Sequence, residues 1–381
     1  MQPTQNSRSI PERIFDSLEK LLRDRKNPEG ALQRISRHLR AGLTLATFAY
    51  LVFLIGMIFL LNWWGERSWF LSILLFVPAA LWLVPLVLLT PLHLVIRPKL
   101  CWITVAALII VCFIYLDFRW AFPAAESKSG LTLLANNMGG RKFQTLADLV
   151  EKENPDIVAL QDTGRVVGLK ERYPERFFSR VDEYVLVSKI PIRRSGLLSE
   201  LMYRGKSIGS WHELQYKDHS IVVYNIHMPT PRIEFAKLRG RGLIAEIFGG
   251  KGIYSSETRK DYRQFMEEKW LLIRDLAEVL RKEQRPFLVA GDFNMSPHGY
   301  HYDLLSANLN DAFADKGRGY GFTFPGAIHG WLNLFGSWLR LDYLFSGKNW
   351  QTHWCRVEPR GIGEHRAVIA RFELNHDSNK P

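Results

Sequence analysis

Polar residues that suit phosphate chemistry follow a short apolar run late in the chain. Residues 288–294 read Leu-Val-Ala-Gly-Asp-Phe-Asn, so Asp292 and Asn294 come directly after a run typical of a buried strand. Ends of core strands are where layered folds gather a site from distant parts of the sequence. Four other polar clusters lie at or near the ends of runs rich in Val, Ile and Leu: Asn137, Gln161-Asp162, His227, and Asp342 with Glu364-His365.

The chemical types in these clusters restrict what a shared site could do. They supply carboxylates, amides and two histidines, a set that suits a hard, oxygen-seeking cation and a phosphate ester. The chain has three cysteines, of which Cys101 and Cys112 lie in an apolar block and Cys355 stands alone. This spacing indicates neither a disulfide framework nor a cysteine-based zinc site.

Strand-like and helical runs alternate after about residue 130, which predicts an α/β domain over residues 131–374. A helix is expected over 143–153, and a long amphipathic helix over 262–282 that ends before Pro286. His298 and His301 are expected to be turn and surface residues. Strands are expected over 131–135, 157–160, 184–188, 221–225, 287–290, 341–345 and 367–372.

The first third of the chain contains three long apolar runs, at 41–61, 69–92 and 100–118. A helix needs about 20 apolar residues to cross the hydrocarbon core of a bilayer. A single run could be a signal sequence, but three in tandem predict transmembrane helices. Pro78 and Pro85 are expected to kink the second span, which membrane helices tolerate.

Flanking cations predict the orientation of these helices. Residues 1–40 precede the first span with Arg34, Arg37 and Arg40, whereas the first joint has only Arg67 beside Glu66. The positive-inside rule then places 1–40 in the cytoplasm and the part after about residue 120 outside it. Residues 10–22 have helical apolar spacing and could form a surface-lying amphipathic helix. Residues 119–130 are expected to be a linker and 375–381 a tail.

Six stretches give the chain a clear resemblance to the endonuclease/exonuclease/phosphatase superfamily, which has the DNase I-like fold. They are 133–139, 155–163, 224–227 (Tyr-Asn-Ile-His), 291–294 (Gly-Asp-Phe-Asn), 340–343 and 363–366 (Gly-Glu-His-Arg). The resemblance covers residues from about 130 to 373. It implies a four-layered α/β sandwich with Mg²⁺, or Mn²⁺ or Ca²⁺, at one end of two packed sheets. With three apolar runs before it, the chain is similar to a group of bacterial membrane-anchored members. This resemblance implies a bacterial inner (plasma) membrane as its location, with the catalytic domain outside the cytoplasm.

The resemblance also implies roles for the cation. Asp162 is expected to be a metal ligand, Asn137 to support the metal or the phosphate oxygens, and Glu364 to complete the cation site. Two positions depart from the family pattern. Its usual Gln-Glu is Gln161-Asp162 here, and its usual Asp-His is Glu364-His365. Both changes keep a carboxylate, so they alter the expected geometry of the ion and not its presence.

The remaining motif residues are expected to act on the phosphate. Asp292 and Asn294 should orient the attacking water and stabilise charge, and His227 should hold a phosphate oxygen or help the leaving group depart. His365 should be the general base or a charge stabiliser, with its other ring nitrogen held by Asp342. The structural alternatives are a strand end for Asn137, a cap for Asp342 and a core position for His227.

The substrate is less constrained, because a fold does not determine a substrate. The 5-phosphatase branch is disfavoured, since the residues before Asp342 read Trp-Leu-Arg-Leu and lack its Cys-Asp-Arg signature. The net charge of +12 suits a phosphate-bearing substrate or an anionic membrane surface. The candidate substrate-binding residues lie in a basic connection and an apolar loop: Arg232, Arg239, Arg241, Trp331 and Trp338.

These segments leave three functional hypotheses open. Basic and aromatic residues could bind a nucleic acid, which would make the chain a membrane-tethered nuclease. Apolar tips flanked by cations could instead enter an anionic leaflet, and the membrane helices favour this lipid or membrane-associated phosphodiester. A catalytically inactive binding module is the third hypothesis, which the retention of every polar position disfavours. No protein partner is identifiable from the sequence.

Overall fold

The computed structural model describes residues 28–122, 130–140, 144–164, 168–239, 252, 255–326, 336–358 and 364–375. The amphipathic segment expected over 10–22 lies outside these ranges. The chain divides into two compact units. One comprises Met1–Ile55 and Trp82–Ile110, and the other comprises Gly56–Leu81 and Val111–Pro381. The second unit therefore contains the joint between the first two apolar runs together with the α/β part.

Three helices in the described residues are long and apolar enough to cross a membrane: Leu32–Trp64, Ala79–Ile96 and Pro98–Tyr115. This confirms the three apolar helices expected from the sequence. The second begins at Ala79 and not at 69, because Pro78 disfavours helical backbone in the residue before it and lacks an N–H. Pro85 lies in the first turn of α4, where proline is tolerated and where the span changes from a 3-10 helix to an α-helix. The elements are α2 (Pro28–Trp64), α3 (Trp69–Leu74), η2 (Ala79–Leu83), α4 (Val84–Ile96), η3 (Pro98–Leu100), α5 (Cys101–Ile110) and η4 (Val111–Tyr115).

The first unit combines a few internal polar contacts with an apolar exterior. Thr47 Oγ1 lies 2.8 Å from His93 Nε2, which joins α2 to α4. Arg97 donates a 2.7 Å hydrogen bond to Thr44 Oγ1. Apolar side chains such as Val87 and Val95 are largely exposed. Apolar surface on this scale is unusual in a protein surrounded by water and fits a helix surrounded by lipid.

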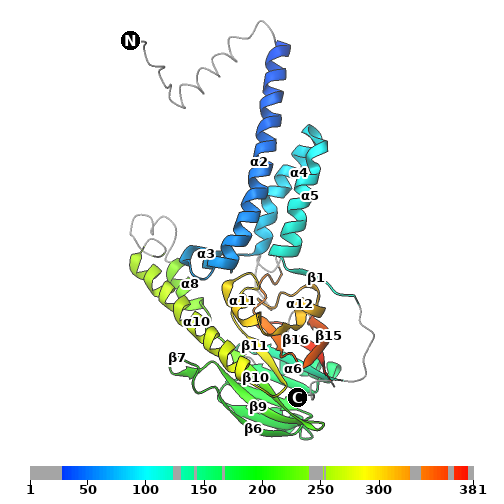
Figure 1. The fold of residues 1–381 in the computed structure, drawn as a ribbon, viewed down its shortest axis with the longest axis vertical. Helices are drawn as coiled ribbons and strands as arrows, with labels where there is room; N and C mark the ends of the chain where they lie inside the picture. Colours follow the sequence, from blue (N-terminus) through cyan, green and yellow to red (C-terminus); the bar gives the residue numbers. More distant parts are fainter. Residues whose placement is uncertain are drawn as a thin grey trace. The chain divides into compact units, whose positions relative to one another are not determined.

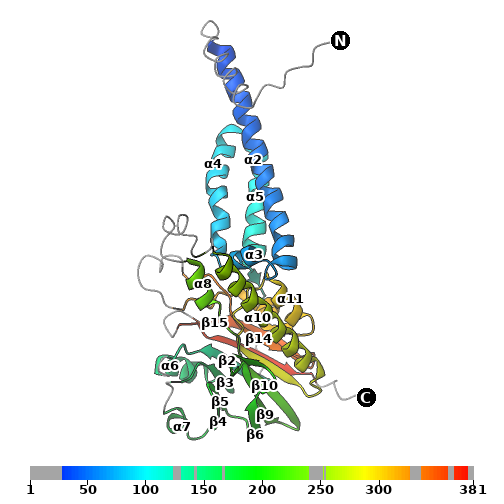
Figure 2. The ribbon, with the colours of Figure 1, turned by 90° about the vertical axis from the view of Figure 1, so that its left-hand side faces the viewer.

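The second unit has four layers, helix, sheet, sheet and helix, as the family resemblance implies (Figures 1 and 2). One six-stranded sheet has the order β15-β16-β2-β3-β5-β4, and the other has the order β12-β14-β11-β10-β9-β6. Helix α6 (Gln144–Glu153) covers the first sheet, and α10 (Ser256–Lys282) covers the second. Shorter helices are α7 (Leu169–Arg172), α8 (Arg232–Arg239), α11 (Tyr300–Ser306) and α12 (Ala312–Lys316).

The strands of the first sheet are β2 (Leu131–Asn137), β3 (Ile157–Gln161), β4 (Phe177–Val181), β5 (Tyr184–Ser188), β15 (Trp350–Val357) and β16 (Val368–Leu374). Those of the second are β6 (Ile192–Leu197), β9 (Gly209–Tyr216), β10 (His219–His227), β11 (Phe287–Asp292), β12 (Asn310–Asp311) and β14 (Asp342–Ser346). Two small pairs complete the set, β1 (Phe118–Trp120) with β13 (Arg318–Tyr320) and β7 (Met202–Tyr203) with β8 (Lys206–Ser207).

Burial on both faces explains the continuous apolar runs of the central strands. Leu133 and Ala135 on β2 face Val223 and Ala290 of the opposite sheet, in the core between the sheets. Leu134, between them in sequence, instead packs with α6. Both faces therefore require apolar side chains, which explains why these strands do not alternate polar and apolar residues.

Helix α10 has a clear start and an apolar face. Its N-cap is Ser255, whose side chain accepts a hydrogen bond from Thr258 N. Leu272, Ile273 and Leu276 recur at helical spacing and pack on the second sheet. The helix begins six residues earlier than the apolar pattern predicts, because its first turns follow a polar cap.

Two regions differ from the sequence-based expectation. Strand β1 covers residue 118, predicted to end the third span, and residues 119–120 of the predicted linker, and it pairs with β13. The preceding Asp117 lies 3.1 Å from the buried Arg340. His301, expected at the surface, is buried, with its Nδ1 3.8 Å from the Glu66 carboxylate. Both differences arise because the residues beside the apolar helices pack on the α/β part.

Candidate active site

Strand register brings the predicted residues to one edge of the two sheets. His227 ends β10 and is the register partner of Asp292 at the end of the parallel strand β11. Asp292 in turn pairs in register with Asp342, the first residue of the antiparallel strand β14. In the other sheet, Asn137 at the end of β2 pairs with Gln161 at the end of β3. Parallel neighbours share one carboxyl edge, so the polar residues after them meet there.

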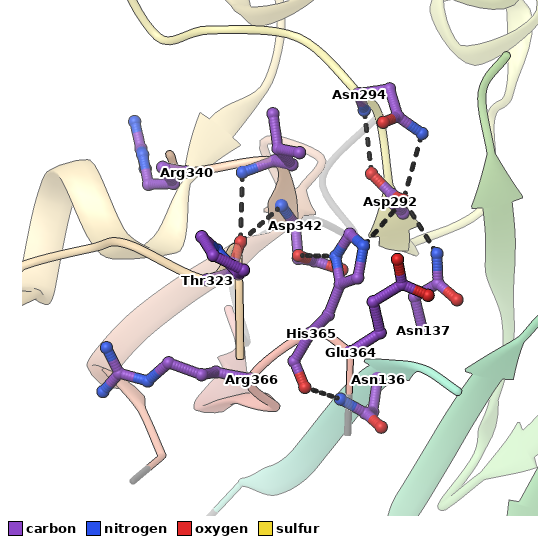
Figure 3. Close-up of polar contacts among 12 residues, drawn as sticks. Asn136, Asn137, Asp292, Asn294, Thr323, Arg340, Asp342, Glu364, His365 and Arg366 are labelled. Atoms are coloured by element: carbon purple, nitrogen blue, oxygen red, sulfur yellow. Dashed lines mark hydrogen bonds and ion pairs between the residues drawn. The ribbon is translucent and has the colours of Figure 1, made fainter. Parts of the chain in front are cut away.

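His365 is held between two carboxylates (Figure 3). Its Nδ1 lies 2.8 Å from Asp342 Oδ2, and its Nε2 lies 3.8 Å from Asp292 Oδ2. All three side chains are buried. The backbone N–H of Asp342 donates a 3.2 Å hydrogen bond to the Thr323 hydroxyl, which fixes the start of β14. The carboxylate on Nδ1 favours the tautomer with a proton there.

Two amide side chains orient Asp292. Asn137 Nδ2 donates a 2.8 Å hydrogen bond to Asp292 Oδ2, and Asn294 Nδ2 donates one of 3.0 Å to the same atom. The backbone N–H of Asn294 donates to the other oxygen, Oδ1, at 2.9 Å. The left-handed backbone of Asn294, with φ of 49°, makes this tight turn after the strand. Asp292 is therefore fixed in one orientation at the centre of the cluster.

Glu183 holds His227, and the sequence motifs do not include it. Glu183 Oε1 lies 2.8 Å from His227 Nδ1, so His227 Nε2 faces the site, 3.9 Å from Asp292 Oδ2. Glu183 directly precedes the buried strand β5, and this is the one signal in the sequence that could have indicated it. Two histidines, each with a carboxylate on Nδ1, thus present Nε2 toward the same Asp292 oxygen.

The surrounding charges shift the pKa values of these groups. Burial by itself lowers the pKa of His365, but Asp342 and Asp292 outweigh it and raise the value to about 9. Burial also opposes the charged form of His227, yet Glu183 and Asp292 together raise its pKa. The hydrogen bond from His227 lowers the pKa of Glu183, and burial raises the pKa of Asp342. Carboxylates on both sides of each ring favour the imidazolium form.

Oxygen donors for a cation border the same cavity. Asp162, Asn137 and Glu364 all line it, and Asp162 is held there by a left-handed backbone with φ of 48°. Glu364 is also paired with the Arg232 guanidinium. Carboxylate and amide oxygens are the donors that Mg²⁺, Mn²⁺ and Ca²⁺ prefer, so this set fits such an ion.

A second group of donors lies beside the first. Among the described residues, Asp292, Asp342 and His365 form the one cluster of three Asp, Glu, His or Cys donors within 4.8 Å of one another. Asp342 Oδ2 and His365 Nδ1 already bind each other, although the buried Asp342 Oδ1 has no hydrogen-bond partner. The set with Asp162 and the cluster with His365 are therefore two groups of donors that could hold a cation.

The cavity lined by Asp162, Asp292 and His365 has a volume of about 520 Å³. Arg232 and Trp338, two of the predicted substrate-binding residues, line it. Arg241 and Trp331 lie outside the described residues, and of Arg239 only the backbone, in α8, is described. Phe76, from the joint between the first two apolar helices, also lines the cavity. Reasoning from the motifs could not find it, because it lies in the apolar block.

A buried amide pair connects the two sheets behind this cavity. Gln161 Nε2 donates a 2.5 Å hydrogen bond to Asn225 Oδ1, and Asn225 Nδ2 donates one of 3.0 Å to the Leu160 carbonyl. Gln161 and Asn225 each precede a site residue by one or two positions. The pair therefore fixes the distance between the strands that carry Asp162 and His227.

The model of the Endonuclease/Exonuclease/phosphatase family matches residues 137–363, more than half of the chain. The chain belongs to this family. The matched range includes Asn137, His227, Asp292 and Asn294, which all line the cavity. Family membership supports phosphoester hydrolysis as the class of activity, and the mixed α/β sheets agree with the family fold.

Several solved structures are similar to this chain. A family protein from Bacteroides vulgatus is 16% identical, covering 65% of this chain and 100% of its own, with a TM-score of 0.45. A humanized D. rerio TDP2 is 13% identical, covering 65% and 100%, with a TM-score of 0.46. The mannosyl-6-phosphatase Bt3783 of Bacteroides thetaiotaomicron is 16% identical, covering 64% and 100%, with a TM-score of 0.44. No curated protein matches the sequence.

Proposed function

We propose that this protein is a membrane-anchored, divalent-metal-dependent phosphoester hydrolase whose substrate is a lipid or another membrane-associated phosphodiester. The observation that carries the proposal is the placement of Asp292 between two histidine Nε2 atoms, at 3.8 and 3.9 Å. Each histidine is held on its other nitrogen by a carboxylate. A phosphate group placed against this cluster would face an oriented carboxylate and two cationic donors at once.

Asp292, His365 and His227 each have a separate role in the proposed reaction. Asp292, held by Asn137 and Asn294, orients the water that attacks phosphorus and accepts its proton. As the new P–O bond forms and the ester P–O bond breaks, negative charge grows on the phosphate oxygens. His365 Nε2 stabilises that charge, and His227 donates a proton to the departing alkoxide. The products are a phosphate with one ester bond fewer and an alcohol.

Asp162, Asn137 and Glu364 would hold the cation. A bound divalent ion acts as a Lewis acid that withdraws charge from the phosphate oxygens. Arg232 pairs with Glu364, so this arginine would compete with a cation for the Glu364 carboxylate.

The three apolar helices anchor the enzyme in the membrane in this proposal. The cations before the first helix favour a cytoplasmic N-terminus, which puts the catalytic part outside the cytoplasm. A reporter fused after Pro381 tests the orientation. Active alkaline phosphatase is expected there, and a bright green fluorescent protein with inactive phosphatase would reverse the assignment.

Hydrolysis of bis(p-nitrophenyl) phosphate by the full chain in detergent tests the activity. Release of p-nitrophenol should stop in EDTA and return when Mg²⁺, Mn²⁺ or Ca²⁺ is added in excess. DNA, RNA and phospholipids are then compared under the best cation. Activity that survives EDTA would reject the metal requirement, and hydrolysis of nucleic acid alone would favour the membrane-tethered nuclease.

A further inference from the structure

The joint between the first two apolar helices belongs to the second unit, which also contains the active site and is called the catalytic unit below. Trp69 and Ile73, one helical turn apart on α3, pack against a buried cluster that includes Tyr262 and Met266 of α10. The guanidinium of Arg259 on α10 lies 5.8 Å from the Trp69 ring. The joint therefore packs on the catalytic unit instead of forming a free loop.

Glu66 fixes the start of the same joint. Its carboxylate accepts a 2.7 Å hydrogen bond from the backbone N–H of Tyr300, and the Arg67 guanidinium lies 4.1 Å from the Tyr300 ring centre. Burial raises the pKa of Glu66 to about 7. A buried polar anchor and a packed helix thus hold the residues that follow, including Phe76, in one place.

Phe76 continues this contact into the active-site cavity. Its ring meets that of Phe235 on α8 edge-on, with centroids 5.1 Å apart, and Phe235 stacks on the buried Tyr262 at 5.7 Å. Both phenylalanines are half-buried and line the cavity that contains Asp292 and His365. One wall of the active site is therefore contributed by the segment between two apolar helices.

The apolar wall extends to the catalytic histidine. Phe324 lies against His365, with ring centroids 4.9 Å apart, and Trp338 and Leu339 complete this side of the cavity. The same cavity is therefore lined by aromatic and aliphatic side chains as well as by the carboxylates and amides of the phosphate cluster. A ligand that fills it would meet both polar and apolar groups.

Among the described residues, the charges that line the cavity fit a ligand with one phosphate better than a nucleic acid strand. Among the described residues that line it, Arg232 is the one arginine or lysine, and its guanidinium is paired with Glu364. A groove for a nucleic acid strand tracks several phosphates with several cations. One cation beside one cluster of phosphate-binding residues matches a ligand with a single phosphate instead.

We propose that the aromatic lining of this cavity, to which Phe76, Phe235 and Trp338 contribute, binds the first part of a hydrocarbon chain of a membrane lipid phosphoester. This inference rests on the proposed function, because it assigns the phosphate of the same lipid to Asp292 and His365. The position of Phe76 supports a membrane source, since the chain enters apolar helices on both sides of its segment. Hydrocarbon is the chemistry that a mainly apolar, aromatic wall recognises.

Binding of n-alkylphosphonates tests the subsite without requiring hydrolysis, because their P–C bond is not an ester. Methyl through octyl phosphonates are titrated calorimetrically into the full chain in nanodiscs with Mg²⁺, and empty nanodiscs correct for partitioning. Affinity should rise about fourfold per methylene until the cavity is filled. Phe76→Ala and Phe235→Ala should reduce the ratio of octyl to methyl affinity at least tenfold. An affinity independent of chain length in the unaltered protein would overturn the proposal.

The controls separate the subsite from general packing. Phe70 lies on α3 but is 53% exposed and does not line the cavity, so Phe70→Ala should keep the chain-length ratio. Phe76→Trp adds volume to the wall, so the best chain should become shorter while the protein stays folded. Variants at Phe76 and Phe235 that keep the ratio of the unaltered protein would reject the assignment.

Two further measurements distinguish this proposal from the proposed function, and a membrane-bound substrate from a soluble one. If phosphonate binding keeps its chain-length dependence but no diester is hydrolysed with any cation, the subsite is supported and the hydrolase is rejected. Hexadecyl p-nitrophenyl phosphate is then offered in the same vesicles as the protein or in separate ones. Hydrolysis should be at least tenfold faster in the same vesicles, and equal rates would overturn the membrane source.

Discussion

The Nε2 atom of His365 lies 3.8 Å from Asp292 Oδ2, although the two residues come from different sheets and are far apart in sequence. Asp292 ends β11, whereas His365 precedes β16 of the other sheet. Packing of the two sheets therefore assembles the site. His365 contacts Asp292 and Asp342 of the other sheet, so its substitution is expected to reduce activity most.

His365→Ala should lower kcat for bis(p-nitrophenyl) phosphate by about 10² or more, the usual effect of removing a positioned acid–base or charge-stabilising group. His219→Ala is the matched control, since His219 is a half-exposed histidine at the start of β10, away from the site. A folded His365→Ala protein with near-normal kcat would contradict the role given to this residue.

Glu183→Gln should lower kcat about tenfold. Glutamine keeps a hydrogen bond to His227 Nδ1 but loses the charge, and a hydrogen bond to a charged group is worth about 1.4 kcal/mol more than a neutral one. Steady-state kinetics at saturating substrate measure the change. Glu200→Gln, at an exposed glutamate of the same unit, should leave kcat unaltered. Equal effects of the two substitutions would mean that Glu183 does not act through His227.

Asp117→Asn should destabilise the catalytic unit by about 3 kcal/mol, because removing one partner leaves a buried charge poorly compensated. Arg340 is 3% exposed and lies 3.1 Å from Asp117 and 2.8 Å from Asp311. Urea unfolding of the detergent-solubilised chain measures the loss. Asp315→Asn, at a half-exposed surface pair with Lys316, should change stability by less than about 0.5 kcal/mol. Unchanged stability of Asp117→Asn would show that Asp311 alone compensates Arg340.

Acid should destabilise the protein through His212. This histidine is buried between the hydroxyls of Ser195 and Ser210, and burial lowers its pKa to about 4. In the unfolded chain His212 binds a proton below about pH 6.5, whereas in the folded chain it stays neutral down to about pH 4. The free energy of unfolding therefore decreases as the pH falls from 6.5 to 4. This group alone contributes about 1.4 kcal/mol per pH unit in that window.

The same group can be isolated by a substitution. His212→Gln keeps hydrogen-bonding groups but cannot titrate, so the slope of its unfolding free energy against pH should be smaller by about 1.4 kcal/mol per unit. Urea unfolding at four pH values between 4.5 and 7.5 compares the two proteins. Identical slopes would show that His212 is protonated equally in both states.

Asp162→Asn should raise the Mg²⁺ concentration needed for half-maximal activity at least tenfold, because an amide oxygen is a weaker donor to a hard cation than a carboxylate. Activity titrated with Mg²⁺ measures the shift. Asp218→Asn, at an exposed turn before β10, controls for the lost charge. An unchanged Mg²⁺ requirement in Asp162→Asn would remove Asp162 from the cation site.

The sequence by itself determined the fold class and the motif residues of the site. Strand-forming runs buried on both faces are continuous and apolar, and each ends in a polar residue such as Asn137, His227 or Asp292. Such a pattern is local, so it can be read without knowing how the sheets pack. The order of six motifs along the chain then indicated the family, and long apolar runs indicated three helices.

The tertiary structure alone decided which residues support and enclose these motifs. Glu183 reaches His227, Arg232 reaches Glu364 and Asp117 reaches Arg340 only because the sheets and loops pack in one way. In the sequence, Phe76 falls within the predicted second membrane span. In the structure that span begins after Pro78, and the ring of Phe76 lines the active-site cavity. Contacts between distant segments depend on packing geometry, which the local periodicity of a sequence does not encode.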